Sequence, residues 1–185
     1  MVEELIREVD CCLKNGCYMA ALTTALTLPD ICGKAKYPDM TKQTKQRYIQ
    51  WYNEYIGKNE KPVDGREDTP YLSDELVYSL RCSVLHQGNP NIGESSLDIE
   101  YFELIWQEVE GANIPVFASE SEIVGNDEQE KAVHIKYSVN IRHVCAVLCN
   151  GAGKYYREHK EEFNFFNYNI KNMDFRTRRM FAIQQ

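Results

Sequence analysis

The hydrophobic positions of residues 71–90 recur at the spacing of an amphipathic α-helix. Ser73 is placed to cap the N-terminus of this predicted helix, and the run Gly88-Asn89-Pro90 is typical of a helix end. The apolar positions form one arc that we expect to be buried: Leu72, Leu76, Val77, Leu80 and Val84.

The other side of the same predicted helix carries a second, smaller apolar patch of Tyr78, Cys82 and Leu85. On a regular helix Arg81 and His86 lie about 140° apart, with this patch between them. A helix with two apolar faces must pack against two things. The second packing partner is either another layer of the same domain or the same helix of a partner chain. In the case of a partner chain, two Arg–His pairs would meet across a two-fold axis.

Helical periodicity also predicts four other helices. Pro29 should end or kink the second of them, and Asn140 is placed to cap the last. Residues 34–39 are expected to form a connector, and residues 57–70, rich in Gly, Pro and charge, a polar loop. The four predicted helices span residues 2–14, 17–28, 41–56 and 141–162.

Alternating apolar and polar residues predict two strands, at residues 97–106 and 133–139. We expect them to pair as an antiparallel hairpin, with the acidic segment 119–130 as an exposed loop. The sequence therefore predicts a mainly α fold: a helical bundle with a small antiparallel β-hairpin inserted before the last long helix.

With 185 residues, 43% of them hydrophobic, the chain fits one domain over residues 1–185. It divides into a helical part (1–92), an acidic hairpin region (93–140), and a last helix with its tail (141–185). No apolar stretch is long enough to cross a membrane, and the acidic N-terminus is unlike a signal peptide. We therefore expect a cytoplasmic protein without a membrane partner.

The seven cysteines are odd in number and lie mostly in helical patterns, which favours reduced thiols over a disulfide framework. Cys145 and Cys149 share a predicted helix face but have no matching second pair of zinc ligands. Phosphate-binding glycine loops and the G-x-S-x-G elbow are missing from the sequence. We expect no metal and no cofactor.

The net charge of −7 disfavours a nucleic-acid partner, but the charges are unevenly distributed. Residues 94–130 contain eleven acidic and no basic residues, so the rest of the chain carries +4. Five basic residues near residue 40 could neutralise an RNA backbone, although a solvated helix face with scattered lysines is the commoner explanation. These residues are Lys34, Lys36, Lys42, Lys45 and Arg47.

An arginine beside a histidine suits phosphate chemistry. His86 could take a proton from a ribose 2′-hydroxyl or give one to the leaving oxygen, while Arg81 stabilises charge on the phosphate oxygens. The plainer alternative is that Arg81 pairs with a carboxylate and His86 only closes its helix.

The run Arg81-Cys82-Ser83-Val84-Leu85-His86 resembles the R-x4-6-H motif of the HEPN superfamily. The phrases at residues 28–33 and 47–52 are similar to those of small uncharacterised bacterial relatives. The resemblance covers about the first ninety residues. It implies a helical bundle with the motif helix at a dimer interface, and metal-independent endoribonuclease activity in toxin, phage-defence or RNA-processing systems.

Under this resemblance Arg81 and His86 are the catalytic residues, supported by Cys82, Ser83 and Asn89. Active members commonly place Asn, Asp or His directly after the arginine, where this chain has Cys82. Three hypotheses stay open. The chain is a homodimeric HEPN ribonuclease, an inactive HEPN-like module that binds RNA, a nucleotide or a protein such as an antitoxin, or an unrelated helical scaffold.

Overall fold

The computed structural model describes residues 1–61, 71–88, 101–106, 116–124 and 131–165. Most of these residues are helical, and three strands form a small sheet. The helices are α1 (Val2–Lys14), α2 (Tyr18–Lys36), α3 (Thr44–Tyr52), the π-helix η1 (Asn53–Gly57), α4 (Lys58–Glu60), α5 (Asp74–Cys82), the π-helix η2 (Ser83–Gln87), α6 (Ile141–Glu158) and the 3₁₀-helix η3 (Lys160–Phe163). The strands are β1 (Tyr101–Ile105), β2 (Val116–Val124) and β3 (Lys131–Asn140).

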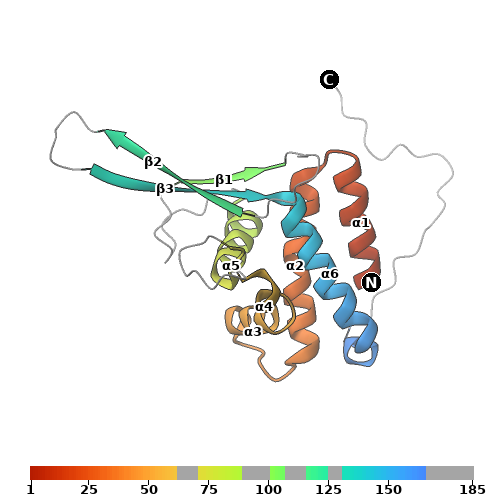
Figure 1. The fold of residues 1–185 in the computed structure, drawn as a ribbon. Coiled ribbons are helices and arrows are strands. Elements are labelled where there is room, and N and C mark those ends of the chain that lie inside the picture. The colour runs from red at the N-terminus through yellow and green to blue at the C-terminus, as the bar shows by residue number, and fades with distance from the viewer. Residues whose placement is uncertain (62–70, 89–100, 107–115, 125–130, 166–185) are drawn as a thin grey trace.

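Helix α2 is the centre of the bundle, because it contacts α1, α3, α5 and α6 (Figure 1). Its small residues Ala21 and Ala25 are fully buried, which lets neighbouring helices approach closely. Pro29 lies inside α2, and the helix continues for seven residues beyond it. Ending at Pro29, one of the two expected outcomes, therefore does not occur, and residues 34–36 are helical instead of belonging to a connector.

Large aromatic side chains fill the core between α2, α3 and α6. Tyr48, Trp51 and Tyr52 of α3 are fully buried, as is Tyr155 of α6. The hydroxyl of Tyr52 donates to the backbone oxygen of Leu72, which ties α3 to the start of α5. The aromatic side chains of α3 and α6 are thus the core of the bundle.

The sheet has three strands in the order β1-β3-β2. Strands β1 and β3 are parallel, with Phe102 opposite Tyr137, whereas β2 runs antiparallel to β3. The predicted antiparallel pairing of residues 97–106 with 133–139 is therefore wrong. The antiparallel partner is β2, part of which was expected to be an exposed loop. The acidic residues Glu120 and Glu122 suggested an exposed loop. Their spacing of two residues is, however, also the spacing of side chains on one face of a β-strand.

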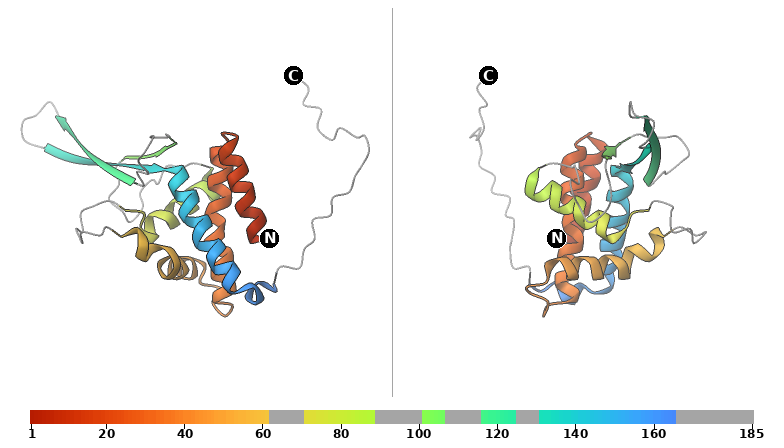
Figure 2. Two further views of the ribbon diagram at one scale, coloured as in Figure 1. Left: turned by 45° about the vertical axis from the view of Figure 1, so that its right-hand side comes forward. Right: turned by 90° about the vertical axis from the view of Figure 1, so that its left-hand side faces the viewer.

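The sheet lies at one end of the helical part, and β2 and β3 extend away from it (Figures 1 and 2). Helix α6 follows β3 directly, because Asn140 ends the strand and caps the helix. The Asn140 side-chain oxygen accepts a hydrogen bond of 2.9 Å from the backbone N–H of Arg142. This predicted cap is confirmed.

The predicted helix bounds differ from the observed ones mainly at C-terminal ends. Helix α1 matches its prediction, while the third predicted helix begins at Thr44 and continues through η1 to Glu60. Helix α6 ends at Glu158, four residues early. Residues 62–70 of the expected loop, and the tail from residue 166, lie outside the described residues.

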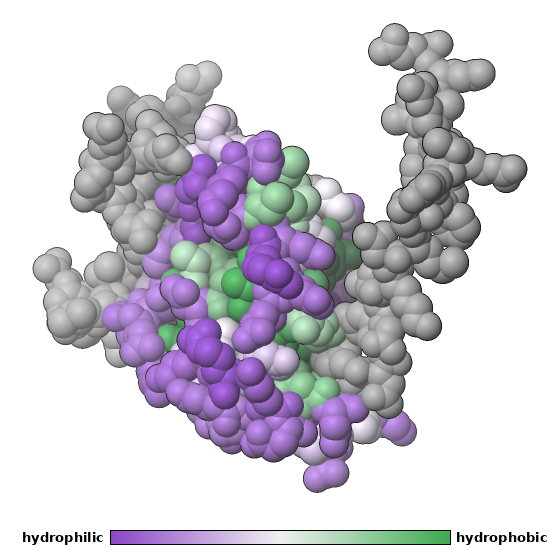
Figure 3. Space-filling model, turned by 90° about the vertical axis from the view of Figure 1, so that its right-hand side faces the viewer, coloured by the Kyte–Doolittle hydropathy of each residue, from purple (hydrophilic) through white to green (hydrophobic). Residues whose placement is uncertain are grey.

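The face around α1 is mostly hydrophilic, with hydrophobic patches between the polar side chains (Figure 3). This agrees with the pattern of α1, whose buried residues Val2 and Val9 lie on its inner side. Within the parts of the chain that the structure describes, we find no helix with the length and hydropathy needed to cross a bilayer.

Candidate functional site

Helix α5 begins as the sequence predicts. The Ser73 hydroxyl accepts a hydrogen bond of 3.2 Å from the backbone N–H of Leu76, and Asp74 and Glu75 occupy the first turn, where negative charge is favoured. All five residues of the predicted apolar arc are buried. The arc fixes α5 against α2 and α3, and thereby sets which side of α5 faces the rest of the molecule.

The end of this helix departs from α-helical geometry. Residues Ser83–Gln87 form the π-helix η2, and the backbone N–H of Gly88 donates to the carbonyl of Ser83, five residues earlier. Gly88 has a φ of +63°, which ends the helix in the left-handed conformation that glycine favours. In this wider turn, residues five apart lie nearly above each other.

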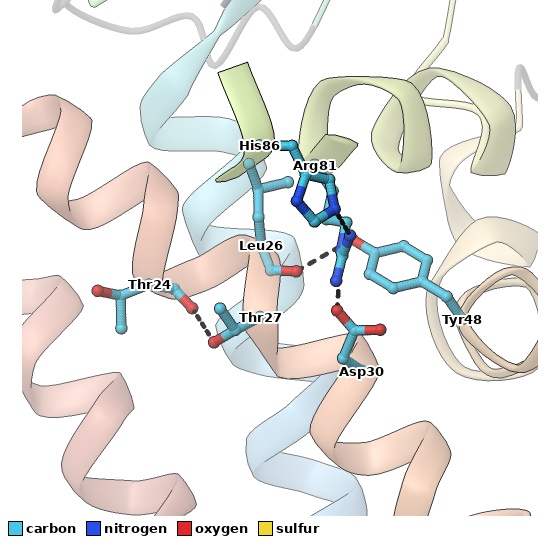
Figure 4. Close-up of polar contacts among 7 residues, drawn as sticks. All are labelled: Thr24, Leu26, Thr27, Asp30, Tyr48, Arg81 and His86. Atoms are coloured by element: carbon cyan, nitrogen blue, oxygen red, sulfur yellow. Dashed lines mark hydrogen bonds and ion pairs between the residues drawn. The ribbon is translucent and has the colours of Figure 1, made fainter. Parts of the chain in front are cut away.

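Arg81 and His86 are consequently in direct contact. Arg81 Nη1 lies 2.8 Å from His86 Nε2, where a regular α-helix would hold the two side chains on different sides (Figure 4). A guanidinium has donors only, so His86 Nε2 is the acceptor and the ring proton is on Nδ1. The expected separation of about 140° is wrong for this helix because of the π-turn.

The third member of the site is Asp30 of α2. Arg81 Nε donates to Asp30 Oδ2 at 2.9 Å, and both side chains are largely buried, 15% exposed for Arg81 and 19% for Asp30 (Figure 4). Asp30 was not among the site residues predicted from the sequence. A signal existed, since Asp30 is the only charged residue between Cys17 and Gly33.

The pair is ionic but strongly affected by burial. Burial raises the pKa of the Asp30 carboxyl, and the nearby charges of Arg81 and Arg47 offset this only in part. Burial alone would lower the pKa of Arg81, but Asp30 outweighs it and the pKa of the guanidinium is raised. An arginine stays charged at any physiological pH, so Arg81 is a permanent cation in this site.

Two tyrosines adjoin Arg81. The Tyr78 ring meets Tyr48 edge to face, with centroids 5.3 Å apart, and Arg81 Cζ lies 6.0 Å from the centroid of Tyr78. The buried Tyr48 hydroxyl points to the carbonyl of Leu26, 3.4 Å away (Figure 4). Burial first, and then the Cys82 thiol, raise the pKa of Tyr78. These rings form the apolar wall beside the charged groups.

Of the expected supporting residues, Cys82 lies beside Arg81 and Tyr78, and Ser83 is buried in the π-turn. Asn89 lies outside the described residues. The second apolar patch, Tyr78, Cys82 and Leu85, is half-buried within the single chain.

The structure separates the five basic residues that were expected to contact RNA. Lys45 Nζ lies 5.7 Å from the centroid of Tyr78, the ring that Arg81 also approaches. Lys34 lies over Phe165 and Lys36 over Tyr55, and Lys42 is exposed. Arg47 is half-buried and donates to the carbonyl of Met40. Lys45 therefore shares an aromatic neighbour with the Arg81 site.

The plainer alternative for Arg81 is correct in one respect, because this arginine does pair with a carboxylate. His86, however, does more than end its helix, since its ring nitrogen accepts from the same guanidinium. Asp30, Arg81 and His86 thus form a continuous chain in which a carboxylate holds an arginine and the arginine holds an imidazole.

All seven cysteines are free thiols. Burial raises the pKa of Cys145 to about 12, and that of Cys149 to about 12, so neither is a ready nucleophile. Comparison of the chain with protein-family models, curated proteins and solved structures gave no match.

Proposed function

We propose that this protein is a metal-independent endoribonuclease of HEPN type that acts as a homodimer, in a toxin, defence or RNA-processing role. The observation that carries the proposal is the contact between Arg81 and His86, at 2.8 Å, at the end of a helix whose sequence resembles the R-x4-6-H motif. A permanent cation beside an imidazole that can accept and return a proton suits phosphodiester cleavage.

The reaction is a transesterification. His86 Nε2 takes the proton of a ribose 2′-hydroxyl, the 2′-oxygen forms a bond to the adjacent phosphorus, and the bond from phosphorus to the 5′-oxygen breaks. A protonated imidazole supplies the proton that the leaving 5′-oxygen needs. The products are a 2′,3′-cyclic phosphate and a 5′-hydroxyl, and Arg81 stabilises the charge on the phosphate oxygens.

In the resting chain the His86 lone pair faces Arg81 Nη1, so the substrate must compete for both groups. A phosphate oxygen is a better acceptor for a guanidinium than a neutral imidazole is, because the hydrogen bond is then between opposite charges. On this proposal, phosphate binding turns Arg81 Nη1 toward the substrate and frees His86 Nε2 for the 2′-hydroxyl.

The half-buried patch of Tyr78, Cys82 and Leu85 is the proposed dimer contact. Leu85 directly precedes His86 in η2, so pairing two such patches would bring two motifs to one groove. Two histidines would then be available for the two proton transfers. Lys45, close to Tyr78, would contact a phosphate next to the one that is cleaved.

The test is cleavage of a labelled RNA in the presence of EDTA, with analysis of the product ends. We expect wild-type protein to form 2′,3′-cyclic phosphate ends, and Arg81→Ala and His86→Ala to lower the rate at least 100-fold. Matched controls are Arg7→Ala on the exposed side of α1 and Gln87→Ala in the same π-turn, which should cleave normally. Equal cleavage by His86→Ala and wild type would overturn the proposal.

A second candidate is an inactive HEPN-like module that binds RNA, a nucleotide or a protein partner such as an antitoxin. Cys82 favours it, because this thiol beside Arg81 is a weaker hydrogen-bonding group than the Asn, Asp or His that active members commonly have there. Binding of RNA by wild type and His86→Ala with equal affinity, and cleavage by neither, would select this alternative.

A further inference from the structure

Asp30 is an acidic residue in the interior of a buried helix. Aspartate is a poor helix former away from helix ends, and here it directly follows a proline, which removes one backbone hydrogen bond of α2. Its side chain reaches across 51 positions of sequence to Arg81. This placement needs a reason other than helix formation.

Stability does not supply that reason. Burial raises the pKa of Asp30 despite the ion pair, which means that Arg81 only partly offsets the loss of water around the carboxylate. In addition, Asp30 Oδ1 is buried and finds no hydrogen-bond partner among the described residues. A buried acceptor without a donor is unfavourable, so the stability of the fold alone does not explain an aspartate at this position.

The geometry at Arg81 gives a reason for an aspartate at position 30. Asp30 binds the Nε edge of the guanidinium and His86 lies at Nη1, so the planar group is held at two of its donors. Without Asp30, the long arginine side chain would be free to rotate among its rotamers. The ion pair therefore fixes the plane of the guanidinium, and with it the direction from which Nη1 meets His86.

We propose that Asp30 is a positioning residue of the site: it orients Arg81, and through Arg81 it holds His86 in the tautomer whose Nε2 carries no proton. The predicted effect of Asp30 on catalysis rests on the proposed nuclease function. Its predicted effect on the orientation of Arg81 and on the tautomer of His86 does not. The tautomer matters because only an unprotonated Nε2 can accept the proton of a 2′-hydroxyl.

The test uses Asp30→Asn, which keeps the shape of the side chain and removes its charge. Asp10→Asn is the matched control, since it breaks a short ion pair of 2.6 Å, to Lys14, that is exposed on α1. Asp30→Glu is the second variant: it keeps the charge, so the pair can still form in the folded chain, but moves the carboxylate by one methylene group.

The first readout is the ¹⁵N NMR spectrum of the His86 ring without RNA, at about pH 8.5, where an ordinary histidine is neutral. We expect an unprotonated Nε2 in the wild type and in Asp10→Asn, and a shift toward the Nε2–H tautomer in Asp30→Asn. An unchanged tautomer in a folded Asp30→Asn protein would overturn the inference. Because no substrate is present, this readout decides the role of Asp30 even if wild-type protein fails to cleave RNA.

The second readout is cleavage kinetics. Misplacement of a catalytic group by about 1 Å lowers rates roughly 100-fold, so we expect kcat of Asp30→Asn to fall about 10- to 100-fold while KM changes less. Asp30→Glu should also lose kcat, because orientation and not charge is altered. Normal kcat in both variants would overturn the inference, whereas wild-type protein without activity would overturn the proposed function instead.

Discussion

Arg81 Nη1 and His86 Nε2 lie 2.8 Å apart. On a regular α-helix these two residues, five positions apart in the sequence, would point about 140° away from each other around the helix axis. The π-helix η2 removes this separation, because its hydrogen bonds join residues five positions apart. π-Turns of this kind are rare in proteins, but those that are found often lie at functional sites. The contact is therefore a property of the backbone of residues 83–88, as much as of the two side chains.

Gly88 tests this dependence on the backbone. Its φ of +63° lies where a side chain is strained, and no atom lies within 4 Å of a Cβ built there. Gly88→Ala should therefore lower the free energy of unfolding by about 1–2 kcal/mol through the backbone alone. We also expect it to disturb the π-turn, to weaken the contact between Arg81 and His86, and to reduce RNA cleavage.

The matched control is Gly16→Ala. Gly16 has a φ of +73° and equally open surroundings, but it follows α1, away from α5 and η2. Both variants should show similar losses of stability in urea unfolding, while only Gly88→Ala affects cleavage. Equal effects of the two variants on cleavage would mean that the π-turn geometry is not needed.

Leu85 tests the proposed dimer. Leu85→Arg places a charge in the half-buried patch next to His86, so a dimer formed through this patch should become a monomer in light scattering. Met19→Arg is the control, because Met19 is a large hydrophobic side chain, 43% exposed, on α2. A wild-type monomer would mean that the two motifs never meet, and the nuclease proposal would then be abandoned first.

Asp30 should make stability depend on pH in a specific direction. Its pKa is raised in the folded chain, so its contribution to stability is present below the unfolded pKa and is lost as the pH rises through the folded value. At neutral pH we therefore expect Asp30→Asn to unfold at the same or a slightly higher urea concentration than wild type. Below about pH 3, where the carboxyl is protonated in both states, this difference should disappear.

A clear loss of stability in Asp30→Asn at pH 7 would show instead that Arg81 more than offsets the burial of the carboxylate. Asp10→Asn serves as the reference, because its exposed pair with Lys14 should contribute little to the unfolding free energy at any pH.

Gly151 allows α6 to approach η1. A Cβ at this position would lie 2.6 Å from Ile56 Cγ1 and 2.8 Å from Ile56 Cδ1. Gly151→Ala should therefore lower the free energy of unfolding by about 1–3 kcal/mol, despite the better helix propensity of alanine. Ile56→Ala in the same chain should recover part of the loss, which a double-mutant cycle measures. Gly153→Ala, whose Cβ would come no nearer than 3.2 Å to Ile6, should be close to neutral.

Ser73 caps the helix that carries the site. Ser73→Ala removes the acceptor for the Leu76 N–H and should lower the free energy of unfolding by about 1 kcal/mol. Ser79→Ala, inside the same helix, should leave stability unchanged or raise it, because alanine is the best helix former. Thermal unfolding of both variants separates loss of the cap from loss of a hydroxyl group.

The sequence by itself determined the features that depend on neighbours along the chain. The spacing of apolar residues was enough to predict α1 and the buried arc of α5, because helical periodicity sorts side chains between core and solvent. The caps at Ser73 and Asn140 were equally predictable, since a cap acts within three residues.

Only the tertiary structure decided features that depend on distant contacts. The direction of β1 relative to β3 follows from how the chain crosses between them, and local alternation of residues is the same for parallel and antiparallel strands. The π-turn at Ser83–Gln87 likewise has no periodic signal, and it changes which residues share a side of the helix.

Asp30 shows the same limit within the site. Its charge in an apolar helix was visible in the sequence, but its partner Arg81 lies 51 positions away and comes within 2.9 Å only because α2 and α5 pack together. Local patterns identify the side chains that can do chemistry. Packing decides which of them meet, because a contact between distant segments is formed by the whole fold and not by the residues beside it.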